Sequence, residues 1–144
     1  MSHTYSANLI HCVFSTKERK PTIPTDQQGK LWAYLIGIGK NEGVDLLATG
    51  GTENHVHLLL SLPPTRMLSE VVQKLKGNSS HWMGTGFCWQ QGYGAFSVSP
   101  SQVAVVKEYI RNQAEHHRKQ SFEDEFISLL NKCGIEYDPQ FVFG

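Results

Sequence analysis

Residues 44–62, VDLLATGGTENHVHLLLSL, decide the fold of this chain. Residues 44–48 and 55–62 contain enough apolar and β-branched side chains to form strands, and Gly50 and Gly51 between them favour a turn. A Pro-Pro pair follows at 63–64 and ends the second strand, because proline cannot donate to a sheet ladder. The stretch therefore predicts an antiparallel hairpin near the middle of the chain.

The segments on either side of the hairpin predict the rest of the sheet. An apolar strand over residues 6–14 and a helix over residues 25–43 precede it, and a helix over residues 68–82 and a strand over residues 95–98 follow it. The order β-α-β-β-α-β predicts an α+β, ferredoxin-like fold. In this fold the four-stranded sheet is antiparallel, its helices cover one face, and the first and third strands are central.

Two more helices are expected after the last strand. We expect a capping box at Ser99 and Gln102, with Pro100 in the first helical position, and an uninterrupted helix as far as the histidines at 116 and 117. Ser121 is expected to cap the final helix. A further capping box is expected at Thr25 and Gln28, where the first long helix begins.

Composition and length exclude several classes of protein. A chain of 144 residues with 40% hydrophobic side chains predicts one folded domain over residues 1–144. The longest apolar run, residues 31–39, is too short to cross a bilayer, which takes about 20 helical residues. No basic-then-apolar leader opens the sequence, and the three cysteines form no CxxC pair, so we expect a cytoplasmic protein without contact to a membrane.

The net charge of zero hides an uneven distribution. Residues 1–120 carry 12 lysines and arginines against 8 acids, whereas residues 121–144 carry one lysine and five acids. A basic body of this kind is compatible with a nucleic-acid partner. We expect the acidic C-terminal segment to lie away from such a partner.

The motif His55-Val56-His57 is the first candidate site. Side chains alternate along a strand, so the two imidazoles share one face and can bind one divalent metal with a third ligand from elsewhere. Taken alone, the motif favours the alternative, a pair of half-exposed histidines on the solvent face of a sheet. Only further motifs in the chain can turn the balance toward a metal site.

A second candidate site lies in the helix after Ser99. Tyr109 and Gln113 are four residues apart and therefore neighbours on one helical face. A tyrosine can attack phosphorus when a cation neutralises the phosphate, and a glutamine amide oxygen one turn away can complete a His-His-Gln metal site. The alternative is that Tyr109 packs in the core, although polar residues surround it on most sides.

Several further blocks accompany these two motifs in a fixed order. They are VFSTK at 13–17, NHVHLL at 54–59, KLKG at 74–77, WQQGYGAFSVS at 89–99, YIRNQ at 109–113 and EHHR at 115–118. With these blocks the chain resembles the small single-tyrosine HUH (His–hydrophobic–His) transposases of bacterial insertion sequences, the IS200-like family. The resemblance covers nearly the whole chain.

The resemblance implies a mechanism and partners. His55, His57 and Gln113 would hold Mg²⁺ or Mn²⁺, and Tyr109 would attack a single-stranded DNA phosphate to give a 5′-phosphotyrosine and a free 3′-hydroxyl. The family cleaves and rejoins insertion-sequence ends, recognises subterminal hairpins, and works as a homodimer whose tyrosine helix can complete the partner's site. Because the three implied ligands are neutral, we expect weak metal binding until DNA arrives.

Basic residues near these motifs are expected to contact DNA phosphates. They are Lys17, Arg19, Lys20, Lys74, Lys76 and Arg111. Two other functions stay open from the sequence. One is a zinc hydrolase that uses His55, His57 and a histidine from 116–117, and the other is a ferredoxin-like nucleic-acid-binding domain that has lost catalysis.

Overall fold

The computed structural model describes residues 3–144 and contains one four-stranded antiparallel sheet in the order β2-β3-β1-β4. The strands are β1 (Leu9–Ser15), β2 (Asp45–Gly51), β3 (His55–Ser61) and β4 (Gly94–Val98). The helices are α1 (Thr25–Asn41), α2 (Leu68–Met83), α3 (Val103–Arg111), α4 (Gln113–His116) and α5 (Phe122–Lys132). Short 3₁₀ turns, η1 (Lys17–Arg19) and η2 (Pro100–Gln102), follow β1 and β4.

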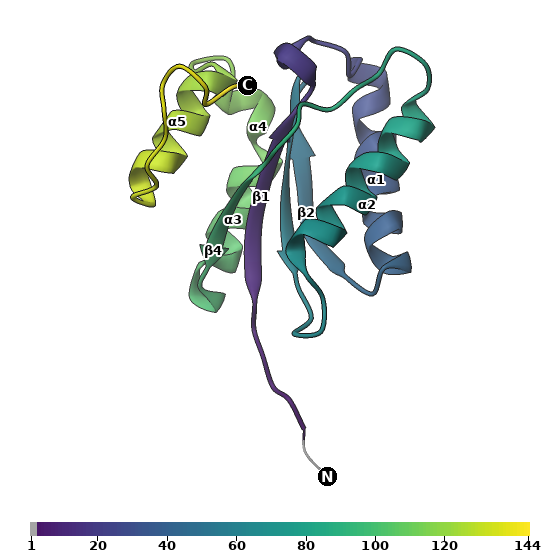
Figure 1. Cartoon of the computed structure of the whole chain (residues 1–144), viewed down its shortest axis with the longest axis vertical. Coiled ribbons are helices and arrows are strands. Elements are labelled where there is room, and N and C mark those ends of the chain that lie inside the picture. The colour runs from purple at the N-terminus through teal and green to yellow at the C-terminus, as the bar shows by residue number, and fades with distance from the viewer. Residues whose placement is uncertain (1–2) are drawn as a thin grey trace.

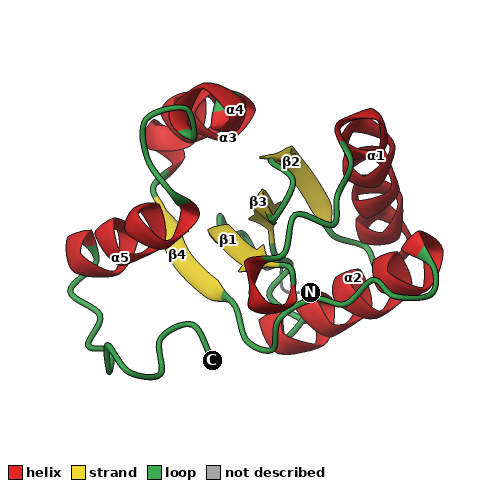
Figure 2. Ribbon diagram, turned by 90° about the horizontal axis from the view of Figure 1, so that it is seen from above, coloured by secondary structure: helices red, strands yellow, loops and turns green. Residues whose placement is uncertain are grey.

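The predicted α+β fold is confirmed, with β1 and β3 at the centre of the sheet. Helices α1 and α2 cover one face, as expected, and α3, α4 and α5 lie on the opposite face (Figures 1 and 2). Among residues 3–144, no helix combines the length and the apolar character needed to span a bilayer.

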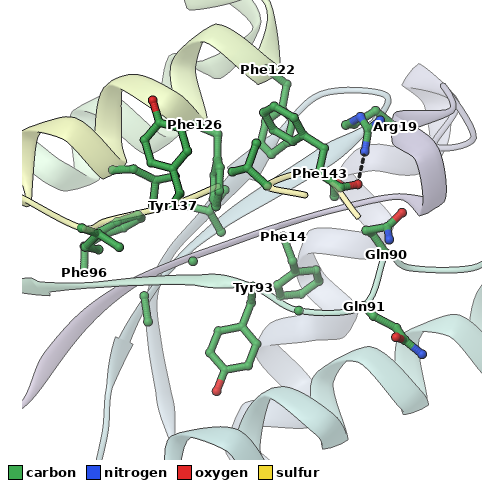
Figure 3. A pocket seen from close by; sticks show the side chains of 18 of the residues that line it. Phe14, Arg19, Gln90, Gln91, Tyr93, Phe96, Phe122, Phe126, Tyr137 and Phe143 are labelled. Atoms are coloured by element: carbon green, nitrogen blue, oxygen red, sulfur yellow. Dashed lines mark hydrogen bonds between the residues drawn. The ribbon is translucent and has the colours of Figure 1, made fainter. Parts of the chain in front are cut away.

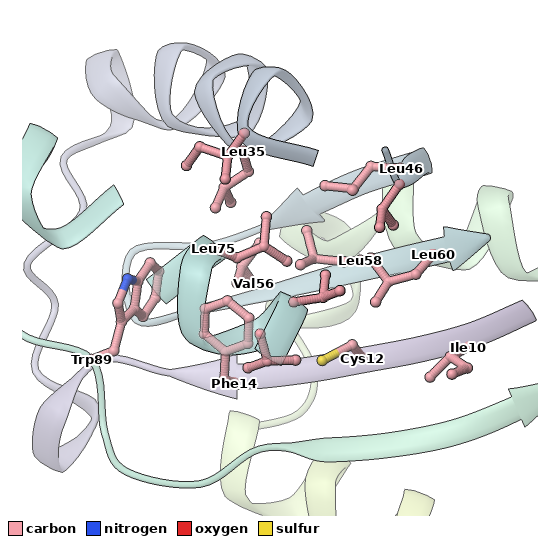
Figure 4. Packing of buried hydrophobic residues seen from close by; sticks show 14 of the residues in the cluster. Ile10, Cys12, Phe14, Leu35, Leu46, Val56, Leu58, Leu60, Leu75 and Trp89 are labelled. Carbon is pink, nitrogen blue, oxygen red and sulfur yellow. The ribbon is translucent and has the colours of Figure 1, made fainter. Parts of the chain in front are cut away.

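The face under α1 and α2 is a dry apolar core. Cys12 and Phe14 of β1 and Val56, Leu58 and Leu60 of β3 point into it and are at most 2% exposed (Figure 4). These residues are two apart along each strand, so the alternation of a β-strand sends all of them to the same side. Their burial contributes hydrophobic stabilisation to the domain.

On the opposite face, α3 and α5 pack over different strands and each meets a glycine. A Cβ atom on Gly50 of β2 would lie 2.2 Å from the carbonyl oxygen of Ile110 on α3. A Cβ atom on Gly94 of β4 would lie 2.7 Å from the ring of Phe126 on α5. Glycine at these two positions therefore allows both helices to approach the sheet closely.

The predictions of capping boxes at Thr25 and at Ser99 are both wrong. Helix α1 begins at Thr25 itself, with Pro24 as N-cap and no side-chain capping bond. Ser99 precedes a 3₁₀ turn, and its hydroxyl bonds the Ser101 hydroxyl at 3.0 Å instead of a backbone N–H. Ser121 does cap α5, where its oxygen accepts a bond from the Asp124 N–H at 3.1 Å.

The helix that carries Tyr109 is also not continuous. It breaks at Asn112 (φ −98°, ψ 25°) and resumes as α4, contrary to the expectation of one helix through His117. Asparagine is a weak helix former, and the residues on either side of the break are fixed separately. Ile110 packs on Gly50, whereas Gln113 is bonded to His55.

Candidate metal and tyrosine site

His55 and His57 lie on the central strand β3, on the face opposite the apolar core. Both side chains are fully buried, and their ring centroids are 5.1 Å apart. The expectation that they share a face is confirmed, since His57 stands opposite Val13 and His55 opposite Ser15 on β1. They are not half-exposed residues on a solvent face, because α3, α4 and α5 cover them.

Each imidazole is held through its Nδ1 atom. The Nδ1 of His55 lies 2.8 Å from Asn54 Oδ1 and 3.0 Å from Thr52 Oγ1. The Nδ1 of His57 lies 2.8 Å from Nε2 of His11, a buried residue of β1. Partners of this kind fix the ring orientation of metal-binding histidines and leave Nε2 directed into the site.

Gln113 and Tyr109 reach the same site from α4 and α3. Gln113 is 1% exposed, its Oε1 lies 3.0 Å from His55 Nε2, and its amide donates to the Tyr109 carbonyl at 3.2 Å. The Tyr109 ring stands edge-on to His57 at 5.7 Å between centroids. The structure thus brings all four residues proposed from the two motifs into one cluster, despite the break at Asn112.

Glu125, which no motif indicated, and His117, a candidate only for the alternative zinc site, complete the cluster. Glu125 of α5 is 2% exposed, and its Oε1 lies 2.9 Å from His57 Nε2, 3.6 Å from His55 Nε2 and 3.1 Å from His117 Nε2. Its Oε2 accepts a hydrogen bond from the Tyr109 hydroxyl. His117 Nε2 also lies 3.1 Å from Gln113 Oε1, whereas His116 is exposed and only stacks on the Tyr109 ring.

A signal for Glu125 was present in the sequence. Glu125 lies three residues after Phe122 and four before Leu129, so it occupies the apolar face of its own helix. A carboxylate on an apolar helical face is rarely buried without a partner. The acidic C-terminal segment, which we expect to lie away from DNA, therefore contributes one carboxylate to the site.

The site is electrostatically uneven. Burial lowers the pKa of His11 and of His55 to about 3 and also lowers the pKa of His57. Burial alone would raise the pKa of Glu125, but hydrogen bonds from His117 and His57 outweigh it and hold that pKa well below its usual range. One carboxylate charge consequently faces His55 and His57, which burial keeps neutral, and His117, where the hydrogen bond to Glu125 outweighs burial and raises the pKa.

The carboxylate also affects the tyrosine. Burial, together with the hydrogen bond to Glu125, raises the pKa of Tyr109 well above its usual value of about 10. The hydroxyl is therefore protonated at neutral pH, and a positive charge nearby would favour its ionisation.

The donor set fits a divalent metal. One ligand atom from each of His55, His57, His117 and Glu125 lies within 4.8 Å of the other three. Imidazole nitrogen and carboxylate oxygen are donors that Mn²⁺ and Zn²⁺ accept readily, whereas Mg²⁺ prefers oxygen alone. The sequence led us to expect only neutral ligands, and Glu125 adds a carboxylate to the candidate donors.

The six basic residues expected at phosphates differ in their surroundings. Four are exposed, namely Lys17, Lys20, Lys74 and Arg111. Arg19 donates to the Phe143 carbonyl at 2.8 Å and stands over the Phe143 ring, and Lys76 donates to the carbonyls of Gln90 and Gly92. Two of the six thus hold loops and the C-terminal segment in place.

A cavity of about 460 Å³ lies beside the site, between the β1–β4 side of the sheet and α5 with the C-terminal segment (Figure 3). Phe122, Phe126, Tyr137 and Phe143 line it from the C-terminal side. Phe122 also forms a boundary with the histidine cluster, because its ring lies 4.6 Å from that of His55. The C-terminal segment therefore shapes both the cavity and the site.

Two histidines on a central strand with a tyrosine from a covering helix define the class of the HUH tyrosine proteins. The profile of the family described as "Transposase IS200 like" matches residues 4–113. The chain belongs to this family.

Individual relatives agree with this assignment. The chain is 25% identical over 129 residues to the transposase for insertion sequence element IS200 of Salmonella typhimurium, covering 82% of this chain and 84% of the relative. It is 25% identical over 114 residues to the ISDra2 transposase TnpA of Deinococcus radiodurans, covering 72% and 81%.

Solved structures share the fold. A putative transposase from Deinococcus radiodurans superposes with a TM-score of 0.62 at 26% identity, over 78% of this chain and 96% of the other. A REP-associated tyrosine transposase bound to a REP hairpin superposes with a TM-score of 0.60 at 17% identity, over 76% and 70%. His117 and Glu125 lie beyond the part of the chain that the family profile matches.

Proposed function

We propose that this protein is a transposase that cleaves and rejoins single-stranded DNA at insertion-sequence ends through a 5′-phosphotyrosine on Tyr109. The observation that carries the proposal is the convergence of Tyr109 with His55, His57 and Gln113 in one buried cluster. Membership of the IS200-like family supports the same activity.

The residues of the chain have distinct roles in the proposed step. The Tyr109 oxygen attacks phosphorus, the bond from phosphorus to the 3′-oxygen breaks, and the leaving oxygen ends as a 3′-hydroxyl. Glu125 Oε2 is the nearest acceptor for the tyrosine proton. Because the phosphotyrosine keeps the energy of the cleaved phosphodiester, rejoining by a 3′-hydroxyl needs no nucleotide.

His55, His57 and Gln113 would hold the divalent cation, Mg²⁺ or Mn²⁺. A cation bound there neutralises phosphate charge and so supplies Lewis-acid assistance. Thr52, Asn54 and His11 orient the two imidazoles through Nδ1 and thereby keep the ligand atoms directed at one point.

DNA binding is proposed to use the exposed basic residues. Lys17, Lys20, Lys74 and Arg111 are exposed and within reach of a phosphate backbone, although Lys20 also pairs with Glu18, while Arg19 and Lys76 support the loops beside them. Hairpin recognition is proposed by analogy with the tyrosine transposase that was solved with a REP hairpin. Affinity should fall steeply as salt rises.

The proposal includes a homodimer formed from single-domain chains. Within one chain Tyr109 already contacts the cluster built on His55 and His57, which favours a site completed in cis. Exchange of the tyrosine helix between subunits is then not needed for a first cleavage.

One experiment tests the proposal. The full chain is incubated with Mn²⁺ and single-stranded DNA that carries the ends of the insertion sequence, and covalent adducts are sought on a denaturing gel. Wild type should form an adduct, and Tyr109→Phe should form none. An adduct in Tyr109→Phe, or none in wild type, contradicts the proposed mechanism.

The position of His117 keeps a second function in view, a zinc hydrolase built on His55, His57 and His117. His117 Nε2 and His57 Nε2 both bond the same oxygen of Glu125, so a compact zinc site is sterically available. This function predicts hydrolysis without a covalent adduct, so the same gel separates the two.

A further inference from the structure

We propose that the cation site has five donors, in which Glu125 and His117 join His55, His57 and Gln113, and that it loads Mn²⁺ before any DNA is bound. The inference rests on the metal site of the proposed function. It adds two ligands, His117 and Glu125, that lie beyond residues 4–113, the part of the chain that the family profile matches.

The first argument is the spacing of the donor atoms. Ligand atoms at about 2.1 Å from one ion stand about 3.0 Å apart at right angles and about 3.4 Å apart at tetrahedral angles. In the cluster Glu125 Oε1 lies 2.9, 3.1 and 3.6 Å from Nε2 of His57, His117 and His55. Gln113 Oε1 lies 3.0 and 3.1 Å from Nε2 of His55 and His117. These are the separations of a coordination shell.

The second argument is the charge of Glu125. The carboxylate is 2% exposed, and within residues 3–144 no lysine or arginine forms an ion pair with it. A buried carboxylate is costly unless a cation or several hydrogen bonds compensate it. Hydrogen bonds from His57, His117 and Tyr109 already compensate part of this cost, and a divalent cation among the imidazoles would add a full counter-charge.

The third argument is that α5 is fixed in the position that delivers Glu125. Ser121 caps the helix, Phe122 packs on the His55 ring at 4.6 Å, and Phe126 covers Gly94. The helix therefore presents its carboxylate from a packed element, which is how precise ligand geometry is maintained.

Two consequences distinguish this site from one with three neutral ligands. The carboxylate charge attracts a cation in the absence of phosphate oxygens, so loading does not wait for DNA. Three imidazole nitrogens also favour Mn²⁺ over Mg²⁺. The carboxylate then lies between the cation and the tyrosine, with Oε1 toward the histidines and Oε2 on the Tyr109 hydroxyl.

The test is calorimetric titration of MnCl₂ into the full chain without DNA, with folding checked by circular dichroism. Glu125→Gln and His117→Gln should each weaken Mn²⁺ binding by at least about tenfold, the lower bound seen even for outer-shell partners. The matched controls are Asp124→Asn and His116→Gln, whose residues are exposed neighbours. They should bind Mn²⁺ within about twofold of wild type.

If Glu125→Gln does not fold, His117→Gln still decides, and Co²⁺ absorption reports directly on the number of nitrogen and oxygen ligands. The inference is overturned if wild type binds no Mn²⁺ without DNA, or if both site variants bind it as tightly as wild type. A wild type that forms the Tyr109 adduct but binds Mn²⁺ only with DNA contradicts the inference and leaves the proposed function intact. Tight Mn²⁺ binding by a wild type that forms no Tyr109 adduct supports the inference and contradicts the proposed function.

Discussion

The two faces of the sheet are built from the same two central strands, yet one face buries apolar side chains and the other buries a polar cluster. On the face toward α1 and α2, Phe14, Val56 and Leu58 pack in the main apolar cluster (Figure 4). On the face toward α3 and α5, their immediate neighbours His55 and His57 meet a glutamine, a carboxylate and a tyrosine. The first face contributes hydrophobic stabilisation, and the second positions polar groups at fixed separations.

The difference shows how a small domain keeps a buried polar site. Burial of imidazoles and a carboxylate costs free energy unless each polar atom has a partner. Here the buried side-chain nitrogens and oxygens of residues 3–144 all have a hydrogen-bond partner. The apolar face supplies the stability that permits such a network on the opposite side.

The largest expected effect separates the faces by activity. His57→Gln should lower DNA cleavage by at least about 10²-fold, because a ligand of the cation and the partner of Glu125 is lost. Its melting temperature should stay close to that of wild type, so the loss of activity is not explained by unfolding. Cleavage is measured by adduct yield over time, and near-normal cleavage would contradict the assignment of His57 to the site.

The adjacent residue tests the other face. Leu58→Ala should lower the free energy of unfolding by about 2–5 kcal/mol, because a fully buried side chain leaves a cavity in the core. Denaturant titration measures this loss. At a temperature where the variant is folded, its adduct yield per folded molecule should match that of wild type. A loss of activity per folded molecule would contradict the assignment of this face to stability alone.

A glycine pair tests how α3 reaches the sheet. Gly50→Ala should lower the free energy of unfolding by about 1–3 kcal/mol and impair cleavage, because the new methyl group meets the Ile110 carbonyl at 2.2 Å. Gly77→Ala in α2 is the control, since a Cβ there meets nothing within 4 Å. The control should be stabilised by about 0.5–1 kcal/mol, and equal behaviour of the two variants would refute the close-contact explanation.

The smallest effect is a pH dependence of the metal-free protein. Burial holds the pKa of His11 and of His55 at about 3, below the ordinary 6.5. The unfolded chain therefore binds protons first, and stability falls as the pH drops below 6.5. His117, whose pKa is raised, offsets part of this loss. From pH 7.5 to 6 the net loss should be about 1 kcal/mol in denaturant titrations, and a rise in stability would contradict it.

Much of the fold was predictable because it is encoded locally. Alternation in residues 55–62 and helical spacing in residues 68–82 were sufficient to predict the strand and the helix, and the structure confirms both. The helix starts were less predictable, since Thr25 and Ser99 offer capping groups that the backbone does not use. Ser121 has the same kind of hydroxyl group, and there the backbone does use it, because the Asp124 N–H donates to its oxygen.

In the candidate site, too, the residues linked by a local pattern could be predicted and those brought together from distant segments could not. Tyr109 and Gln113 could be paired from their spacing, and the structure brings them together at the histidines. The apolar face of residues 122–129 indicated that Glu125 is buried, but its partner His57 is 68 residues away and no local pattern links the two. His117 was one of two candidate histidines, and its contacts with Gln113 and Glu125 distinguish it from His116.

The sequence by itself determined that the two histidines share one face of a central strand, since the period of a strand is two residues. It also determined that a basic body is followed by an acidic end. Only the tertiary structure decided that part of this acidic end belongs to the site. Gly50 and Gly94 let α3 and α5 settle close to the sheet, and that packing brings a tyrosine and a carboxylate from distant parts of the chain to the same two imidazoles.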